Sequence, residues 1–353
     1  MSDANQARRT AVEVAFGGVD ITASIRPYLL SLTYTDQEAE EADDLQLQLQ
    51  DREALWMEDW LAQAVDAASA AKLSMDAVIV RENWLGDGKD VVLPCGTFEL
   101  DSVDASGPPA VVTIKGTALP FSAQIRQTRK SKAWEAYTLS GIAGEMAAAC
   151  GMTLMYEAAT DPFYQRVEQL DTSDIGLLSI LCRQAGISLK ATSRILVLFD
   201  QAAYEAKPTV LTLRRGDGSY TKYKLNVGTA DTQYASCRVS YTAPSGQCIS
   251  ATAKIEDYNE DAKNNQQLEI TAKVSSAAEA KTLAEKLLRL HNKYAKTATF
   301  TLPGSPQLVA GVTVALEGWG AWDGKYLVTQ AKHTVGGSGY SVQVKLRKVL
   351  EGY

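Results

Sequence analysis

Histidine is the usual general base for a catalytic serine, cysteine or threonine, and the chain contains two histidines, His291 and His333. His291 falls near the end of a polar-faced helical pattern, where a histidine complements the negative end of the helix dipole. His333 precedes a pair of glycines, and Ser338 lies in Gly337-Ser338-Gly339 rather than in a Gly-x-Ser-x-Gly elbow. The sequence therefore does not favour a hydrolase that uses a nucleophile.

Paired carboxylates could also perform hydrolysis. Glu99 and Asp101 are spaced to share one face of a strand, and a glycosidase could use them as acid and base. The same spacing arises on any wet strand face, and no aromatic residues suited to stacking on a sugar accompany the pair. We interpret Glu99 and Asp101 as part of a solvated strand.

Metal and phosphate sites have no support in the spacing of the remaining residues. Two distant histidines and five scattered cysteines do not match the clustered ligands of zinc, and the glycines around Asp87 and Asp217 predict turns rather than a phosphate loop. We expect no catalytic residues, no metal and no cofactor. The cysteines are predicted to be small buried hydrophobic residues, and they are Cys95, Cys150, Cys182, Cys237 and Cys248.

Tryptophans in or beside predicted loops indicate contact surfaces, because aromatic residues are enriched at protein interfaces. Trp84, Trp319 and Trp322 are the candidate interface residues. Glycines flank the last two, so packing within a turn is the alternative use. Trp56 and Trp60 are four residues apart, which favours packing on one face of a helix.

The clearest structural element is the stretch EQLDTSDIGLLSILCRQAGISL. Ser173 can cap a helix, and Asp174 lies at its positive end. Leu178 and Leu181 recur at helical spacing, and Gly186 ends the pattern. We interpret these residues as a structural motif. An earlier helix has the same plan, with an apolar face formed by Leu139, Ile142, Met146 and Ala149.

The pattern along the chain predicts an α+β fold with two β-barrel domains of related fold on either side of a small α/β domain. We place the first barrel at residues 1–117, the α/β domain at 118–207 and the second barrel at 208–353. A capping box at Ser276 and Glu279 predicts a helix at about 276–293, inserted in the second barrel.

Composition excludes several classes of protein. The 353 residues carry a formal charge of -7, which argues against a general nucleic-acid binder. The basic residues at 126–132 are interpreted as a solvated linker or a partner contact, and the acidic run at 38–44 as a solvated loop. No apolar run reaches the length of a membrane span, and the polar start lacks the apolar segment of a signal peptide, so we expect assembly in the cytosol.

The order of several stretches resembles the late control gene D family of contractile-tailed phages. The strand ADDLQLQLQD, the segment CGTFELDSVDASGPPAVVTIKGTA and the Gln-x-x-x-Ser-Asp helix appear in that order. The C-terminal FTLPGSPQLVAGVTVALEGWGAWDGKYLVTQAKHTVGGSGYSVQVKLRKV is similar to the closing barrel of the family. The resemblance spans nearly the whole chain.

That resemblance implies a structural baseplate hub protein without enzymatic activity, located in a virion or phage-like particle. Three copies would form a ring that joins the six-fold tail tube, or its initiator, to a three-fold spike and contacts other baseplate proteins. The two related barrels of each copy would supply six similar units, and DNA or other cargo would pass through the lumen without specific binding. The chain ends without a β-helical extension, so the spike should be a separate polypeptide, unlike in hub-spike fusions such as VgrG.

Two alternatives stay open. The chain could be a cell-wall-active or glycan-binding tail protein, which a cluster of aromatic residues beside Glu99 and Asp101 would support. It could also be a tail-tip hub of a non-contractile phage, since that protein shares the implied fold.

Overall fold

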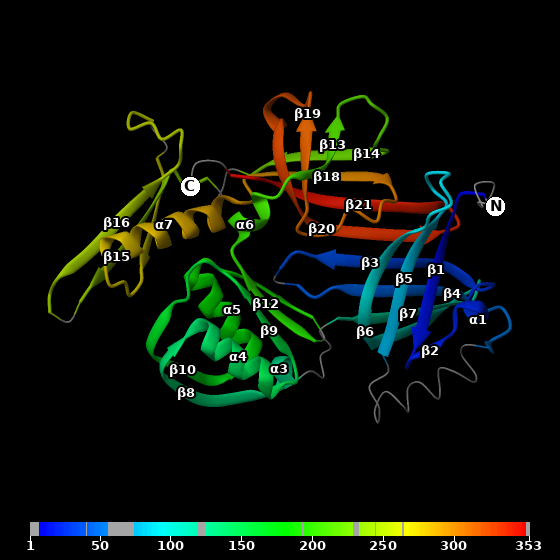
Figure 1. Ribbon diagram of the computed structural model, residues 1–353, viewed down its shortest axis with the longest axis horizontal. Helices are drawn as coiled ribbons and strands as arrows, with labels where there is room; N and C mark the ends of the chain where they lie inside the picture. Colours follow the sequence, from blue (N-terminus) through cyan, green and yellow to red (C-terminus); the bar gives the residue numbers. More distant parts are fainter. Residues whose placement is uncertain are drawn as a thin grey trace.

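A computed structural model of the protein describes residues 7–39, 41–55, 74–118, 124–192, 194–228, 233–243, 245–262 and 265–350. The architecture is mostly β-sheet, arranged in several sheets with helices packed on them (Figure 1). Among the helices described, none is long and apolar enough to cross a bilayer.

The largest sheet contains thirteen strands, drawn from both ends of the chain. Its N-terminal strands are β1 (Arg9–Phe16), β2 (Val19–Asp20), β3 (Leu29–Gln37), β4 (Asp44–Gln50), β5 (Ser74–Glu82), β6 (Val91–Ser106) and β7 (Val111–Thr117). Its C-terminal strands are β13 (Thr209–Arg214), β14 (Lys222–Val227), β18 (Lys296–Pro303), β19 (Thr313–Glu317), β20 (Gly324–Gly336) and β21 (Gly339–Lys348). A short helix, α1 (Thr22–Ile25), lies between β2 and β3.

The two groups of strands are joined directly, because β3 pairs antiparallel with β20 from Ser31 opposite Gly336 to Gln37 opposite Gln330. The prediction that the strands form two closed barrels is therefore wrong. The path of the described strands runs from β14 through β18, β21, β20, β3, β4, β7, β6, β5 and β1 to β2 without returning on itself. Backbone pairing across the middle makes one open sheet of what the sequence presents as two barrels.

The strand order nevertheless repeats within this sheet. The order β3-β4-β7-β6-β5, here called the N-terminal half-sheet, matches β14-β18-β21-β20-β19, the C-terminal half-sheet, when strands are counted along the chain. Every neighbouring pair in both half-sheets is antiparallel. The outer strands differ, because β1 runs antiparallel to β5 whereas β13 runs parallel to β19.

Each half-sheet encloses its own apolar core. On β4 the leucines Leu45, Leu47 and Leu49 are buried while the alternating glutamines face outward, as the two-residue repeat of a strand requires. The C-terminal core contains Phe300, Tyr326 and the other large residues of β18, β20 and β21. A 3₁₀ turn, η2 (Gly320–Trp322), closes the loop between β19 and β20.

An α/β module lies beside the junction of the two half-sheets (Figure 1). Its three-stranded sheet has the order β11-β12-β9, and β8 and β10 form a separate two-stranded ribbon. The elements are α3 (Gln124–Gln127), β8 (Arg129–Thr138), α4 (Leu139–Ala149), β9 (Thr153–Glu157), β10 (Phe163–Ser173), α5 (Asp174–Ala185), β11 (Ser188–Ala191), β12 (Ile195–Phe199) and α6 (Gln201–Glu205).

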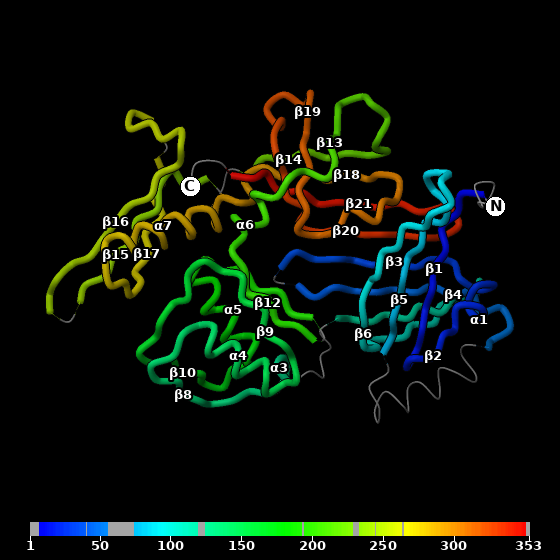
Figure 2. Tube along the Cα trace, viewed as in Figure 1, coloured from blue at the N-terminus to red at the C-terminus, as the bar shows by residue number. Residues whose placement is uncertain are grey.

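A third unit is built around the predicted inserted helix, which is α7 (Ala277–Asn292). This helix does not lie in a barrel. Its apolar face covers a separate three-stranded sheet of order β16-β15-β17, whose strands are β15 (Ser236–Thr242), β16 (Cys248–Lys254) and β17 (Gln267–Thr271). The chain therefore leaves the large sheet after β14 and returns at β18, as the trace in Figure 2 shows.

The α5 helix begins and ends where its sequence predicts. Ser173 is its N-cap and accepts a hydrogen bond from the Gly176 amide at 3.3 Å. Gly186 ends the helix with a φ of 66°, a left-handed conformation that glycine adopts without strain. Leu178 and Leu181 lie in the core of the module.

We expect Leu178→Ala to lower the free energy of unfolding by about 2 to 5 kcal/mol, because it leaves a cavity at a fully buried site. Ser173→Ala should cost about 1 kcal/mol through the lost cap. Ile180→Ala on the exposed face of the same helix is the control, with an expected change within about 0.5 kcal/mol. Urea unfolding measures all three, and equal losses for Leu178→Ala and Ile180→Ala would contradict this account.

Candidate functional site: two buried ion-pair clusters at the module junction

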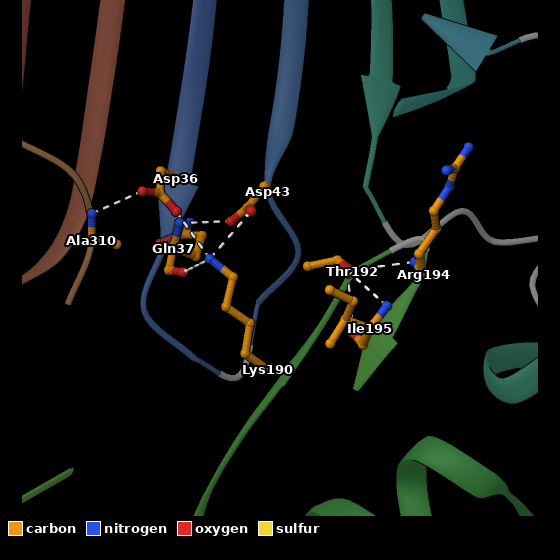
Figure 3. A network of polar contacts seen from close by, with 8 residues as sticks. All are labelled: Asp36, Gln37, Asp43, Lys190, Thr192, Arg194, Ile195 and Ala310. Atoms are coloured by element: carbon orange, nitrogen blue, oxygen red, sulfur yellow. Dashed lines mark hydrogen bonds and ion pairs between the residues drawn. The ribbon is translucent and has the colours of Figure 1, made fainter. Parts of the chain in front are cut away.

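Lys190 of β11 anchors the first cluster, at the point where the α/β module meets β3 and β4 (Figure 3). Its Nζ donates to Asp36 Oδ1 at 2.9 Å and to the Gln37 carbonyl oxygen at 2.6 Å, and it lies 3.2 Å from Asp43 Oδ2. In the β11–β12 hairpin, Thr192 Oγ1 accepts the Ile195 amide at 3.1 Å. The hairpin thus holds Lys190 toward the two carboxylates.

The carboxylates of this cluster are themselves tied to the backbone. Asp36 Oδ2 accepts the Ala310 amide at 2.8 Å, and Asp43 Oδ1 accepts the Gln37 amide at 2.8 Å. Burial raises the pKa of Asp43 to about 6, against the opposing attraction of Lys190. Burial lowers the pKa of Lys190, but Asp36 and Asp43 outweigh it and leave that pKa raised. Lys190 therefore stays charged.

Arg347 of β21 forms the second cluster and is fully buried. Its guanidinium donates to Glu205 Oε1 at 2.5 Å, to Gln201 Oε1 at 3.3 Å and to Glu38 Oε1 at 3.4 Å. The other oxygen of Glu205 accepts from Arg289. Burial lowers the pKa of Arg347, but the nearby glutamates outweigh burial, so the arginine is held charged.

The two clusters connect four parts of the chain. Lys190 brings the module to the β3–β4 loop, and Glu205 of α6 joins β21 to α7 through its two arginines. Lys286 of α7 adds a contact to Asp200 at 2.9 Å. Buried charges are stabilising only as complete sets, since removing one partner leaves an uncompensated charge. Such clusters fix how the module, the sheet and α7 are oriented, and they hold no nucleophile.

A shallow pocket lies beside the first cluster, with a volume of about 260 Å³. Its wall combines Ala42, Ile175, Ile187 and Leu290 with the charged Glu41 and Arg183. The lining is mainly small and aliphatic. The lining also contains Ser179, Cys182 and Ser188, but neither histidine lies among its residues to act as a base, and burial raises the pKa of Cys182 to about 12.

The acidic run at 38–44 is not the solvated loop that its composition suggests. Glu38 and Asp43 are buried in the two clusters, whereas Asp44 is exposed. Glu40 lies outside the described residues. A signal for the first cluster is present in the sequence, because Lys190 is the one charged residue of the strand SLKA. Arg347 gives no such signal, since Lys345 and Lys348 flank it in VKLRKV. A buried cation requires a buried acid.

Both histidines lie in structural positions. His333 is buried, with Nε2 3.0 Å from the Leu308 carbonyl oxygen and Nδ1 2.8 Å from the Tyr340 hydroxyl. Burial lowers its pKa to about 4. His291 packs edge-on against Tyr234, and burial followed by the charge of Lys293 lowers its pKa.

Glu99 and Asp101 do not form the regular pair that their spacing suggests. The β6–β7 register shifts between Leu100 and Ser102, so Asp101 sits in a bulge that breaks the two-residue alternation.

In the part of the chain that the structure describes, no group of three or more potential metal ligands occurs. Of the five cysteines, Cys95, Cys182 and Cys237 are buried, Cys150 is half-buried and Cys248 is exposed.

The candidate interface tryptophans occupy three different environments. Trp84 is half-buried in the β5–β6 loop, with the Arg81 guanidinium 4.0 Å above its ring. Trp319 is buried in the core of the C-terminal half-sheet and donates from Nε1 to the Leu213 carbonyl of β13 at 2.9 Å. Trp322 is half-buried against the same core. An interface role for Trp84 and Trp322 stays a prediction, and Trp56 and Trp60 lie outside the described residues.

Ion pairs neutralise most of the predicted basic cluster. Arg129 lies beside Asp171, Lys132 beside Glu145, and Lys130 Nζ is 2.8 Å from Asp174 Oδ2. Asp174 is therefore buried and paired, in addition to standing at the start of α5. These ion pairs reduce the net positive charge of the β8–β10 ribbon.

We expect Lys190→Met to lower the free energy of unfolding by about 3 kcal/mol, since Asp36 and Asp43 would keep their burial and lose their cation. Lys254→Met removes an exposed ion pair with Glu260 and should change stability by less than about 0.5 kcal/mol. Chemical denaturation measures the free energy of unfolding of both variants. Equal effects of the two substitutions would show that the first cluster does not stabilise the junction.

The buried His333 predicts a pH dependence. Its folded pKa of about 4 lies below the value of about 6.5 in an unfolded chain, so its stabilising contribution is present above pH 6.5 and is lost as the pH falls toward 4. Between pH 7 and 4 the wild type should lose roughly 3 kcal/mol more stability than His333→Gln. Urea unfolding of both proteins at each pH isolates this difference, and parallel losses would refute it.

The sequence is similar to known phage tail proteins. The phage tail baseplate hub (GPD) family model matches residues 117–339. The probable baseplate hub protein of Escherichia phage 186 is 24% identical over 229 residues, covering 63% of this chain and 54% of the relative, and that of Escherichia phage P2 is 27% identical over 209 residues, covering 56% and 48%. The chain thus spans about half the length of these curated relatives.

The fold also matches solved structures. The tail protein from Neisseria meningitidis MC58 superposes with a TM-score of 0.69 at 14% identity, over 96% of this chain and 97% of that one. The family match covers well over half of the sequence, including the whole α/β module and most of the C-terminal half-sheet. The chain belongs to the phage tail baseplate hub family, whose members are components of the virion.

Proposed function

We propose that the chain acts as a structural baseplate hub that assembles into a trimeric ring between a six-fold tail tube and a three-fold spike. The observation that carries the proposal is the repeated strand order of the large sheet. Two similar half-sheets in each copy give a trimer six similar units, which is what a ring must offer to meet six-fold symmetry on one side and three-fold symmetry on the other.

The buried clusters suit this role. A ring that transmits load between tube and spike needs its parts held in fixed orientation, and Lys190, Glu205 and Arg347 connect the module, the sheet and α7 through desolvated charges. The proposed partners are a separate spike protein, the tube or its initiator, and other baseplate proteins. The proposed domain limits stay at residues 117 and 207.

An enzymatic role has no supporting geometry in the described residues, so we propose assembly alone as the activity. DNA or cargo would pass the lumen without specific binding. Of the acidic residues that could line it, Glu38 and Asp43 are committed to ion pairs, and the exposed ones are Glu41, Asp44 and those of the segment 256–261. Acidic side chains there would repel the phosphates of DNA.

Assembly can be tested by native mass spectrometry and by imaging of the chain mixed with its spike and tube proteins. We expect a ring of about 114 kDa, three times the 38.1 kDa chain, before the partners are counted. Partner proteins can complete a weak ring by mass action, so the mixture is the decisive sample. A chain that stays monomeric in the mixture would refute the trimer.

A further inference from the structure

The repeat of strand order predicts more than the number of units. Inside one chain the half-sheets meet where the second part of β20, Gln330–Gly336, pairs with the edge of β3. If the half-sheets are equivalent, the same two kinds of edge must occur once more, as the second part of β6 and the edge of β14. Both edges exist, and in the described part of the chain neither is occupied.

The first open edge is on β6. Its first part pairs with β5 up to Glu99, and beyond that point the strand continues to Ser106 with β7 as its described partner. β20 has the same plan, since it leaves β19 at Leu327 and continues to Gly336 beside β21. The difference is that β3 covers the free side of β20.

The second open edge is on β14, the outermost strand of the sheet, which pairs with β18 alone among the described strands. The Gly228 amide donates to the Ala295 carbonyl, at the end of the pairing with β18. Because backbone amides alternate in direction along a strand, every second amide of β14 points away from β18. Tyr223 and Val227 are 52% and 41% exposed on this strand. Tyr223 also packs on Trp319 at 4.8 Å between ring centroids, which fixes the strand in place.

Unpaired backbone groups on an extended edge bind another strand unless something blocks them. The exposed charges of the two edges differ in sign, because β14 carries Lys222 and Lys224 while the end of β6 carries Asp101 and Asp104, the latter in an exposed ion pair with Lys115. Opposite charges across neighbouring strands favour pairing. The β6 edge therefore fits the β14 edge of a second copy.

We propose that the second part of β6 in one copy pairs antiparallel with β14 of the next copy, as β20 pairs with β3 inside each copy. The proposal rests on the trimer proposed above and identifies the strands through which neighbouring copies contact each other. Such head-to-tail contacts are heterologous, and with a three-fold rotation between copies they close into the proposed ring, which covers every one of these edges.

The internal junction also gives the register. β20 and β6 each shift register once against their partner, between Val328 and Gln330 and between Leu100 and Ser102. Lys332 lies two residues after Gln330 in β20, and Asp104 lies two residues after Ser102 in β6. The two residues therefore occupy equivalent positions in the two half-sheets. The residue opposite Lys332 on β3 is Thr35.

The equivalent of Thr35 on β14 follows from the ladder across the half-sheets. Across β3, β4 and β7 of the N-terminal half-sheet, one row of paired residues is Leu32, Leu47 and Ile114. The corresponding row across β14, β18 and β21 of the C-terminal half-sheet is Tyr223, Phe300 and Val344. Tyr223 thus takes the place of Leu32, and Asn226 takes the place of Thr35. We expect Asn226 of one copy to lie directly opposite Asp104 of the next.

This pair suits a disulfide test, because both side chains are exposed and the position is one without mutual backbone hydrogen bonds, where Cα atoms approach to about 4.5 Å. The variant Asn226→Cys with Asp104→Cys is made in a Cys248→Ser background and oxidised as the assembled ring. We expect covalent trimers on a non-reducing denaturing gel, in at least about tenfold excess over the control.

The control moves one cysteine by a single residue, as Asn226→Cys with Ala105→Cys, which turns that thiol to the other face of β6. Native mass spectrometry before oxidation checks that both variants still assemble. Trimers that stay uncrosslinked, or that crosslink equally in both variants, overturn the β6–β14 contact and leave the trimer standing. A wild-type chain that never forms trimers overturns both proposals.

Discussion

The backbone ladder between β3 and β20 is the contact on which the rest of the molecule depends. Without it the N-terminal and C-terminal strands would be two separate sheets joined through the module, and with it they form one surface. The hydrogen bonds of strand pairing join backbone atoms, so the same kind of contact can form along edges that carry different side chains. What it needs is an extended edge of matching length and direction.

The buried charges lie where that ladder ends. Gln37 closes the pairing with Gln330, and Asp36, Glu38 and Asp43 surround this point, each bound to a cation or an amide from another part of the chain. One further backbone bond follows, in which the Glu38 amide donates to the Thr329 carbonyl at 2.9 Å. Ion pairs of this kind contribute orientation more than net stability, because desolvation offsets most of their attraction.

The sequence predicted local structure well and long-range pairing poorly, for a physical reason. The α5 helix, its Ser173 cap and its Gly186 end depend on residues a few positions apart, and they appear as predicted. The β3–β20 ladder joins residues about three hundred positions apart through backbone atoms, which leave no trace in a hydrophobic pattern. For the same reason the acidic loop looked solvated, since its cations come from β11 and β21.

The repeated strand order has no matching repeat in the sequence, because backbone pairing preserves topology while side chains differ. Equivalent positions carry Leu32 and Tyr223, or Asp36 and Val227, and their neighbours explain the difference. Asp36 faces Lys190 at a junction inside one chain, where a module must be anchored. Val227 lies on the edge that the proposed ring presents to another copy, where a buried carboxylate would have no partner. The two half-sheets therefore share a strand order without sharing side chains at equivalent positions, because those positions contact different neighbours.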